Sequence, residues 1–522
     1  MATPNDTGAA PTARARHNTM AQKKFMYPAE WVKQKPYKVV DSVDIYYTGI
    51  ANKIRAILKE TRLDTLFADE QNLKVAVMSI AGWFEDVISQ NGIWQAFTTE
   101  CERRYGARLP FFSIGADYYP DEINKEDIQY LLWHNLQVVH RLERIIYPLS
   151  PVIDITADMI YDMLNEEYET APENERLHEF IYGHEGYVTN YDHYVSVALW
   201  LHYQSFFNVE NYDEFIAVRN RSLENVNPAD VEKQTLAMGF YVTLMLNGTH
   251  SPLALTTPQW MARIADGHKH LAEWKKVEVR KASCYLVESI ADDGNVTLKD
   301  LCAKGKVKIS AEDLGLGIPT VQVGRTTVIC EFLKFGNAYT RIGSIAENVL
   351  DENVQRYIDT EKAKRDKSEQ KRIYDEFVSA TGGKYVKFFT SKEEAEHFLT
   401  DNLGYAFAEG VKLPDMETQH GVMLMVSPET GLTFQPGFME CLKCDDNPAY
   451  DKAKAEKNSL PVIARANAIP YDVMCRMQDD GMWADATVPG CEDPEEGRRM
   501  AQGNLQFLTD YYYRKYRDMA TA

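Results

Sequence analysis

Two cysteines three positions apart are the residues of this sequence that most directly suggest chemistry. Cys441 and Cys444 lie in the stretch ECLKCDDNPAYD, and a Cys-x-x-Cys pair can hold a metal ion or exchange a disulfide. A structural zinc site usually takes two such pairs, whereas Cys475 and Cys491 stand alone and far apart. The two aspartates that follow Cys444 would raise the pKa of the thiols rather than activate them. We therefore predict an ordinary helix end here, with no metal and no cofactor.

Three polar residues in largely apolar helical stretches form a candidate acid/base site. Asp86 follows a Trp-Phe pair in a run with little polar face, and Asp127 and His134 share one face of another predicted helix. If these helices pack together, a carboxylate and a histidine meet in a partly dry pocket with shifted pKa values, as acid/base catalysis requires. The alternative is a buried hydrogen-bond network that fixes the helix register. The sequence has no GxxxxGK[ST] loop, GxSxG elbow or HExxH motif to support an enzyme further.

A run of basic residues distinguishes one segment of an acidic chain. Between residues 275 and 341 the sequence has eleven Lys or Arg and eight Asp or Glu, whereas the whole chain has a net charge of -20. The candidate nucleic-acid-binding residues are Lys275, Lys276, Arg280, Lys304, Lys306, Lys308, Arg325, Lys334 and Arg341. The alternation at Lys304, Lys306 and Lys308 predicts that these three project from one face of one strand.

Two interpretations of this basic segment remain open. Small barrels bind single-stranded nucleic acid with a basic face and interleaved aromatic residues, which here would be Tyr285, Phe332, Phe335 and Tyr339. A lysine-rich strand is also a common protection of an exposed sheet edge against aggregation.

Short apolar or alternating runs in the same segment predict five strands. They are CYLVESI, NVTLKDL, KVKIS, TTVICEFLKF and NAYTRIGSI, and Asp293-Gly294 and Gly336-Asn337 are typical of tight turns between strands. Five short strands in a compact segment favour a small barrel of SH3-like or OB-like type over residues 275–345.

The rest of the chain is predicted to form helices, followed by a C-terminal part that contains both helices and strands. Residues 25–270 are predicted to form a large all-helical domain. Asp41 and Ser42 are candidate N-caps, residues 75–88 are apolar on most sides and should be buried, and Gly106 should end a helix. Residues 346–380 predict a charged helical linker, and residues 381–522 a small α+β domain. Residues 1–24 read as a disordered tail. The predicted fold class is therefore α+β multidomain.

Composition excludes several classes of protein. The 522 residues, 45% hydrophobic and 26% charged, are typical of a folded protein with substantial cores. The negative charge repels nucleic acid and anionic lipid over most of the surface, so such a partner needs a local basic patch. No apolar run approaches the roughly 18–20 residues that cross a bilayer, and the first residues lack the apolar region of a signal peptide. We expect a cytoplasmic protein with reduced cysteines and no membrane partner.

Several stretches together resemble a known family. They are MYPAEWVKQKPY, IYYTGIANKI, WFEDVISQNGIWQAFTTECERRYGARLPFF, YYPDEINKEDIQYLLWH, EEYETAPENERL, SPLALTTPQWM and DNPAYD. From about residue 25 onward the chain is similar to a family of uncharacterised cytoplasmic proteins of Bacteroidetes, a domain of unknown function. The resemblance therefore implies no activity, ligand or catalytic residue.

The working hypothesis is a non-enzymatic binding or adaptor protein. The helical domain would hold a protein partner or the rest of the chain, and the barrel would contact RNA, DNA or an acidic protein. The alternatives are an enzyme that uses Asp86, Asp127 and His134, and a structural or assembly protein whose oligomeric state the sequence leaves open.

Overall fold

The computed structural model describes residues 25–115, 117–140, 144–184, 187–208, 231–250, 252–317, 320–403, 413, 421–435, 437–465 and 469–513. The predicted tail, residues 1–24, lies outside the described residues. No helix in the described ranges is both long and apolar enough to cross a membrane.

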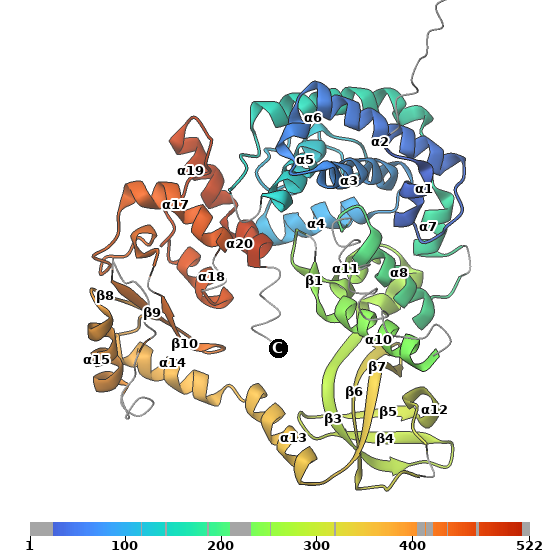
Figure 1. Cartoon of the computed structure of the whole chain (residues 1–522), viewed down its shortest axis with the longest axis vertical. Helices are drawn as coiled ribbons and strands as arrows, with labels where there is room; N and C mark the ends of the chain where they lie inside the picture. The colour runs from blue at the N-terminus through green and yellow to red at the C-terminus, as the bar shows by residue number, and fades with distance from the viewer. Residues whose placement is uncertain are drawn as a thin grey trace, which may run out of the picture.

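Helices dominate the first half of the chain (Figure 1). They are α1 (Pro28–Trp31), α2 (Ser42–Glu60), α3 (Glu70–Ile88), α4 (Ile93–Tyr105), α5 (Lys125–Val139), α6 (Pro151–Glu167), α7 (Glu175–Tyr182), α8 (Tyr191–Gln204), α10 (Val231–Asn247) and α11 (Thr257–Ile264). Short 3₁₀ helices add η1 (Val32–Gln34), η2 (Leu63–Leu66), η3 (Tyr168–Thr170) and η4 (Lys269–Lys276). The region predicted as all-helical also contains a small pairing of β1 (Thr249–His250) with β2 (Leu255–Thr256), which connects α10 to α11.

Local sequence signals place several helix ends. The Asp41 side chain accepts the backbone N–H groups of Val43 and Asp44 at 2.9 and 3.1 Å, which confirms it as the N-cap of α2. Gly106 ends α4 with a φ of 74°, a left-handed conformation that glycine adopts without steric cost. The predicted burial of residues 75–88 is confirmed for most of α3, including Trp83 and Phe84 at 0% exposure.

Five antiparallel strands form the sheet of the middle segment. They are β3 (Glu278–Ile290), β4 (Asn295–Asp300), β5 (Lys306–Ser310), β6 (Thr326–Phe335) and β7 (Ala338–Val349), in the order β5-β4-β3-β6-β7. Both predicted turns are present: Gly294 has a φ of 80° between β3 and β4, and Gly336 has a φ of 60° between β6 and β7. The strand assignments of the sequence are therefore confirmed.

The predicted small barrel of SH3-like or OB-like type is confirmed only as a curled five-stranded antiparallel sheet, a half-barrel whose edge strands do not pair. Pairing irregularities at β3 with β4, β3 with β6 and β6 with β7 bend the strands, as β-bulges do. The edge strands β5 and β7 approach one another but do not pair, and the short helix α12 (Ala311–Leu314) contacts both of them. Helix α12 thus occupies the place where strand pairing would have closed a barrel.

The two faces of the curled sheet bury different sets of side chains. The inner face packs Tyr285, Val287, Leu298 and Phe332 into a small core of its own. The outer face contributes to a smaller cluster, in which Cys284 and Cys302 pack with Val354 and Ile358 of α13 (Glu352–Arg365). Helix α13 is therefore attached to the sheet rather than being a free connector.

Helices α13 and α14 (Ser368–Ala380) lead from the sheet to the C-terminal elements (Figure 1). The strands β8 (Val386–Phe389), β9 (Val422–Ser427) and β10 (Gly431–Gln435) form a second antiparallel sheet, in the order β10-β9-β8. The helical elements here are α15 (Lys392–Asn402), η6 (Met439–Cys441), α17 (Lys452–Arg465), α18 (Tyr471–Asp479), α19 (Pro494–Gly503) and α20 (Leu505–Tyr513).

One continuous hydrophobic core joins the beginning of the described chain to its end. Helix α20 packs its aromatic side chains against α4 and α5, so that the ring centroids of Phe507 and Tyr105 lie 5.6 Å apart and those of Tyr511 and Trp133 5.4 Å apart. The same core cluster runs from Met26 to Tyr513. The division into separate domains stays a prediction, while the structure shows how closely the first and last helices are packed.

Helix α10 contacts the curled sheet through a close approach of two glycines. A Cβ atom on Gly239 would lie 2.2 Å from the Cα atom of Gly343 in β7, so α10 has no room for a side chain at position 239. This contact places α10 against the sheet, and Thr243 and Asn247 of α10 lie in the wall of an open cleft beside it.

Candidate functional site

An open cleft lies between α10, the curled sheet and α13. It leaves about 640 Å³ open to the centres of water molecules, which is the size range of ligand pockets. Its wall is rich in charge, with five cationic and four acidic side chains. The lining residues are Thr243, Asn247, Glu278, Arg280, Lys281, Ala282, Tyr285, Asp300, Ala303, Lys304, Glu331, Glu361, Lys364 and Arg365.

Two of the five cations of the cleft are already neutralised. The Arg280 guanidinium donates to Glu278 at 2.8 Å, and the Lys364 ammonium group lies 2.7 Å from Glu361. Arg280 also donates to the carbonyl oxygen of Lys306 at 3.3 Å, which holds the guanidinium across the strands. Carboxylate partners therefore hold Arg280 and Lys364 in the cleft wall and compensate the positive charge of these two residues.

The other three cations have no acidic partner in the part of the chain that the structure describes. Lys281 and Lys304 are exposed and form no ion pair there. Arg365 donates to the carbonyl oxygen of Ala282 at 3.0 Å, which orients its guanidinium toward β3 without neutralising it. Because these three groups face one cleft, they form a concentrated site for negative charge.

A buried tyrosine lies behind the wall of the cleft. The side chain of Tyr285 is 0% exposed, and its hydroxyl has no hydrogen-bond partner among the described residues, although the residue lines the cleft. Burial raises the pKa of this phenol above its ordinary value, so it stays protonated and can donate. The carboxylate of nearby Asp300 already accepts two hydrogen bonds, from the Ser283 hydroxyl at 2.6 Å and from the backbone N–H of Cys302 at 2.9 Å.

The structure brings only part of the predicted basic cluster to this cleft. Arg280 and Lys304 line it, whereas the other candidates lie outside its wall. Three of them form ion pairs: Lys275 with Asp266, Lys276 with Glu273 and Lys306 with Glu288. The other four lie elsewhere on the sheet: Arg325 before β6, Lys334 on β6, Arg341 on β7, and Lys308 exposed on β5. The predicted alternation along one strand is wrong for Lys304, because β5 begins at Lys306 and Lys304 lies in the preceding turn.

The aromatic residues proposed to interleave with the basic ones are mostly inside the protein. Tyr285 and Phe332 are 0% exposed in the core of the half-barrel. Phe335 packs 5.7 Å from Tyr194 between ring centroids, and Tyr339 is partly covered by Arg280. The cleft therefore lacks a row of open rings on which bases could stack.

Lys281, Lys364 and Arg365 were missed by sequence reasoning. Lys281 belongs to the same basic segment and sits next to Arg280, so charge alone could have included it. Lys364 and Arg365 end α13, in the segment predicted as a charged linker. Only the packing of α13 on the outer face of the sheet places them at the cleft.

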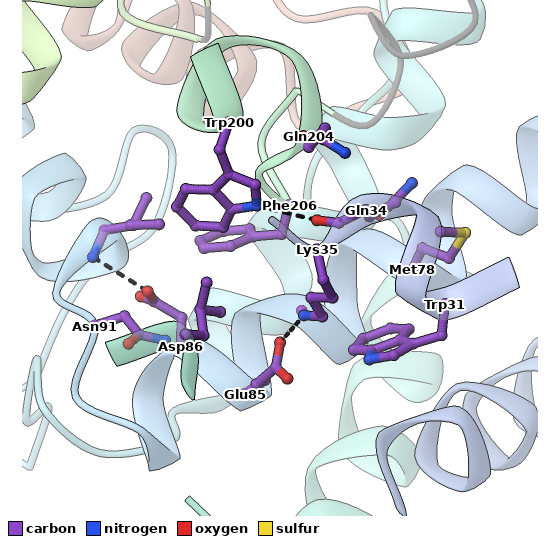
Figure 2. Close-up of a pocket in the computed structure, with 13 residues that line it drawn as sticks. Trp31, Gln34, Lys35, Met78, Glu85, Asp86, Asn91, Trp200, Gln204 and Phe206 are labelled. Carbon is purple, nitrogen blue, oxygen red and sulfur yellow. Dashed lines mark hydrogen bonds and ion pairs between the residues drawn. The ribbon is translucent and has the colours of Figure 1, made fainter. Parts of the chain in front are cut away.

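The three candidate acid/base residues do not share one cavity in the structure. Asp86 accepts the backbone N–H of Trp94 at 2.8 Å and lines a small polar pocket that does not include the other two (Figure 2). Asp127 accepts the hydroxyl of Tyr118 at 2.9 Å, and the Nδ1 atom of His134 lies 3.1 Å from the hydroxyl of Tyr511.

Burial dominates the proton affinity of both aspartates. It raises the pKa of Asp86 to about 7 and that of Asp127 to about 7, while the hydrogen bonds that each accepts oppose the rise. The observed geometry matches the alternative of buried hydrogen-bond networks, each local to its own helices.

The paired cysteines lie at the end of a short helix, as the sequence predicts. Cys441 ends η6 and is buried, and burial raises the pKa of its thiol to about 12. The Cys444 thiol donates to Asp446 at 2.8 Å, and burial together with this carboxylate raises its pKa. Both thiols are free and neither is activated. Across the described ranges, no three His, Cys, Asp or Glu side chains gather where they could hold a metal ion.

The fold places the chain in a class of mixed α+β proteins, in which many helices surround a curled five-stranded antiparallel sheet. Residues 25–301 and 339–514 match the family described as "Protein of unknown function (DUF3843)", and the chain belongs to that family. The expected membership of a family without assigned function is thereby confirmed. The stretch between the two matches carries β5, α12 and β6. Comparison with curated proteins and comparison with solved structures each found no match.

Proposed function

We propose that this protein is a binding protein whose cleft takes an acidic segment of a protein partner. The observation that carries the proposal is the convergence of Lys281, Lys304 and Arg365, which lack acidic partners in the described chain, on one open cleft. Carboxylates of a partner would supply the charge that these cations lack, and charge-assisted hydrogen bonds are stronger than neutral ones.

The acidic side chains of the same wall favour a peptide over a nucleic acid. Asp300 and Glu331, which form no ion pair among the described residues, would repel a continuous row of phosphates. A peptide instead offers backbone N–H groups, which can donate hydrogen bonds to these carboxylates. The buried positions of Tyr285 and Phe332 also remove the stacking surface that single-stranded nucleic acid uses.

The experiment measures the affinity of the full chain for a labelled glutamate-rich peptide, by fluorescence anisotropy at low and at physiological salt. RNA and DNA oligonucleotides of the same net charge are measured in parallel. We expect saturable binding of the peptide that weakens as salt rises, because exposed charge pairs are screened. Tighter binding of the oligonucleotides than of the peptide would contradict the peptide proposal and favour a nucleic acid.

Charge reversal tests whether the cleft itself is responsible. The variant Lys281→Glu/Lys304→Glu/Arg365→Glu should weaken peptide binding by roughly tenfold or more, because three exposed contacts worth about 0.2–1 kcal/mol each become repulsive. The matched control Lys308→Glu/Lys457→Glu/Arg499→Glu reverses the same charge at exposed positions outside the cleft wall. Equal losses in the two variants would show that net charge, and not the cleft, attracts the peptide.

A further inference from the structure

The first half of β3 is a free edge of the curled sheet. Strand β3 pairs with β4 only from Tyr285 onward, where Tyr285 faces Asp300. From Glu278 to Ser283 its only neighbouring strand in the described chain is β6, so its other side is unpaired by any strand. Figure 1 shows β3, β6 and β7 running together toward α10, with β3 on the side of α13. Edge strands present backbone N–H and C=O groups with which a further strand can pair.

This free edge faces the open cleft. The carbonyl oxygen of Ala282 is directed across the cleft, because it accepts the Arg365 guanidinium of α13 at 3.0 Å. Two residues further along β3, the carbonyl oxygen of Cys284 accepts the backbone N–H of Leu301 at 2.8 Å, at the end of the pairing with β4. The cleft therefore begins where the outer neighbour of β3 leaves the strand. The edge contributes four residues to its wall: Glu278, Arg280, Lys281 and Ala282.

A bulge in β3 places two adjacent residues in this wall. Consecutive side chains of a regular strand point to opposite faces, yet Arg280 and Lys281 both line the cleft. The register of β3 with β6 shifts between Arg280 and Ser283, and such bulges re-aim side chains. Lys281 is exposed on the edge itself, while Lys304 and Arg365 approach from the turn before β5 and from the end of α13. Cations thus flank the unpaired backbone of β3.

The length of the edge restricts what can satisfy it. The stretch from Glu278 to Ala282 spans about 17 Å at about 3.4 Å per residue, which is the length of an ordinary strand of about five residues. A compact anion would meet the cations but leave most of the backbone groups of the edge without partners. An extended acidic segment supplies both carboxylates and a row of backbone donors and acceptors.

We infer that the acidic segment of the partner binds as an added β-strand on the free edge of β3. The inference rests on the proposed function and specifies how the same cleft is used. In this mode of recognition the backbone hydrogen bonds give affinity, and alternate side chains give specificity. Every second side chain of a strand lies on the same face, so the recognised segment alternates acidic with uncharged residues. The Ala282 carbonyl has a second lone pair and accepts a peptide N–H beside Arg365.

The test uses three versions of a labelled peptide in which glutamate alternates with threonine. One is unmodified, one is N-methylated at every glutamate, and one is N-methylated at every threonine. N-methylation removes the backbone donor and blocks pairing on that side of the strand. Because alternate residues turn their N–H groups to the same side, only one of the two modified peptides should lose affinity for the full chain. We expect that loss to be about tenfold or more, since several hydrogen bonds disappear together.

The outcomes separate the mode of binding from the proposed function. Fluorescence anisotropy at low salt measures all three affinities, and the peptide that loses affinity reports the direction of the added strand. Equal affinities for all three peptides, or equal losses for both modified ones, would overturn the inference but leave the cleft as a binding site for acidic peptides. Absence of binding by the unmodified peptide would contradict the proposed function as well.

Amide hydrogen exchange of the full chain locates the added strand. With saturating unmodified peptide, the fragment that contains Glu278–Ser283 should exchange several-fold more slowly, because outward N–H groups of β3 become hydrogen-bonded. The matched control is β5, which carries Lys306 and Lys308, pairs only with β4 in the described sheet and lies outside the cleft wall. Its exchange should stay unchanged. Slower exchange in β5 without any in β3, or in neither strand, would overturn the inference.

Discussion

The buried pocket beside Asp86 and the open cleft contain the same kinds of charged residue in opposite surroundings. Lys35 in the pocket is 8% exposed and has a carboxylate partner that is itself 1% exposed. Lys281 and Lys304 in the cleft are exposed and form no ion pair within the described chain. A buried ammonium group without a partner would be very unfavourable, whereas an exposed one stays hydrated. The pairing of a lysine is thus governed by its burial.

This difference assigns different roles to the two lysine environments. The Lys35–Glu85 pair connects η1 to α3, and Asn174 extends the network to the N-terminus of α7. It is therefore part of the helical framework. The unpaired cations of the cleft contribute little to that framework, which leaves them free for a partner. Three predictions break or sharpen this comparison.

The largest effect is expected for removal of the buried cation. Lys35→Met leaves Glu85 charged and buried without its counter-ion, which should cost about 3–5 kcal/mol of unfolding free energy. Urea denaturation followed by circular dichroism measures the loss. The control is Lys371→Met, which breaks an exposed pair with Asp375 and should cost no more than about 0.5 kcal/mol. A double variant, Lys35→Met/Glu85→Gln, should recover much of the loss, and equal costs for the two single variants would contradict the comparison.

A pH-dependent effect of intermediate size is expected at Asp86. Burial raises its pKa from an ordinary value of 3.8 to about 7 in the folded protein, with Glu85 raising it further and Lys35 lowering it. The folded state therefore binds the proton more tightly than the unfolded chain, so the Asp86 contribution to stability falls as pH rises. Relative to Asp86→Asn, the unfolding free energy of the wild type should drop by about 1.4 kcal/mol per pH unit between about pH 4 and 7.

Denaturation of both proteins across this pH range measures the Asp86 effect. The control is Asp375→Asn, which removes a carboxylate that is exposed on α14. If the unfolding free energies of the wild type and Asp86→Asn changed in parallel with pH, the pKa of Asp86 would be the same in the folded and the unfolded protein, which would contradict the prediction.

The smallest effect on stability is expected in the cleft. Lys281→Ala and Lys304→Ala remove exposed side chains without ion pairs and should change the unfolding free energy by no more than about 0.5 kcal/mol. The same variants should weaken binding of the acidic peptide several-fold. A stability loss as large as that of Lys35→Met would mean that these lysines support the fold rather than a ligand.

Much of the local structure could be predicted from the sequence. The five strands of the half-barrel follow from short apolar runs and from Gly294 and Gly336, which permit tight turns. The start of α2 follows from the capping side chain of Asp41, and the end of α4 from Gly106. These signals act over a few residues, so the sequence contains them in full.

The candidate sites depended on contacts between distant segments and were only partly predictable. Arg280 and Lys304 were identified by charge, but Arg365 reaches the same cleft only because α13 packs on the sheet. Similarly, Asp86 was recognised as a polar residue in an apolar helix, yet its pocket also needs Lys35 from η1 and Asn91 from the turn after α3. Helices α3 and α5 do pack against one another, as the proposed meeting of Asp86 with Asp127 and His134 requires, but each of the three side chains has its own hydrogen-bond partner.

The sequence by itself determined the kinds of elements, their ends and the basic character of the middle segment, because hydrogen-bond caps, turn glycines and side-chain alternation are local. Only the tertiary structure decided that the sheet stays open, that α20 packs against α4 and α5, and which charges are buried or exposed. The physical reason is that burial, and with it the energy of a charge or an unpaired amide, depends on segments that are far apart in the chain.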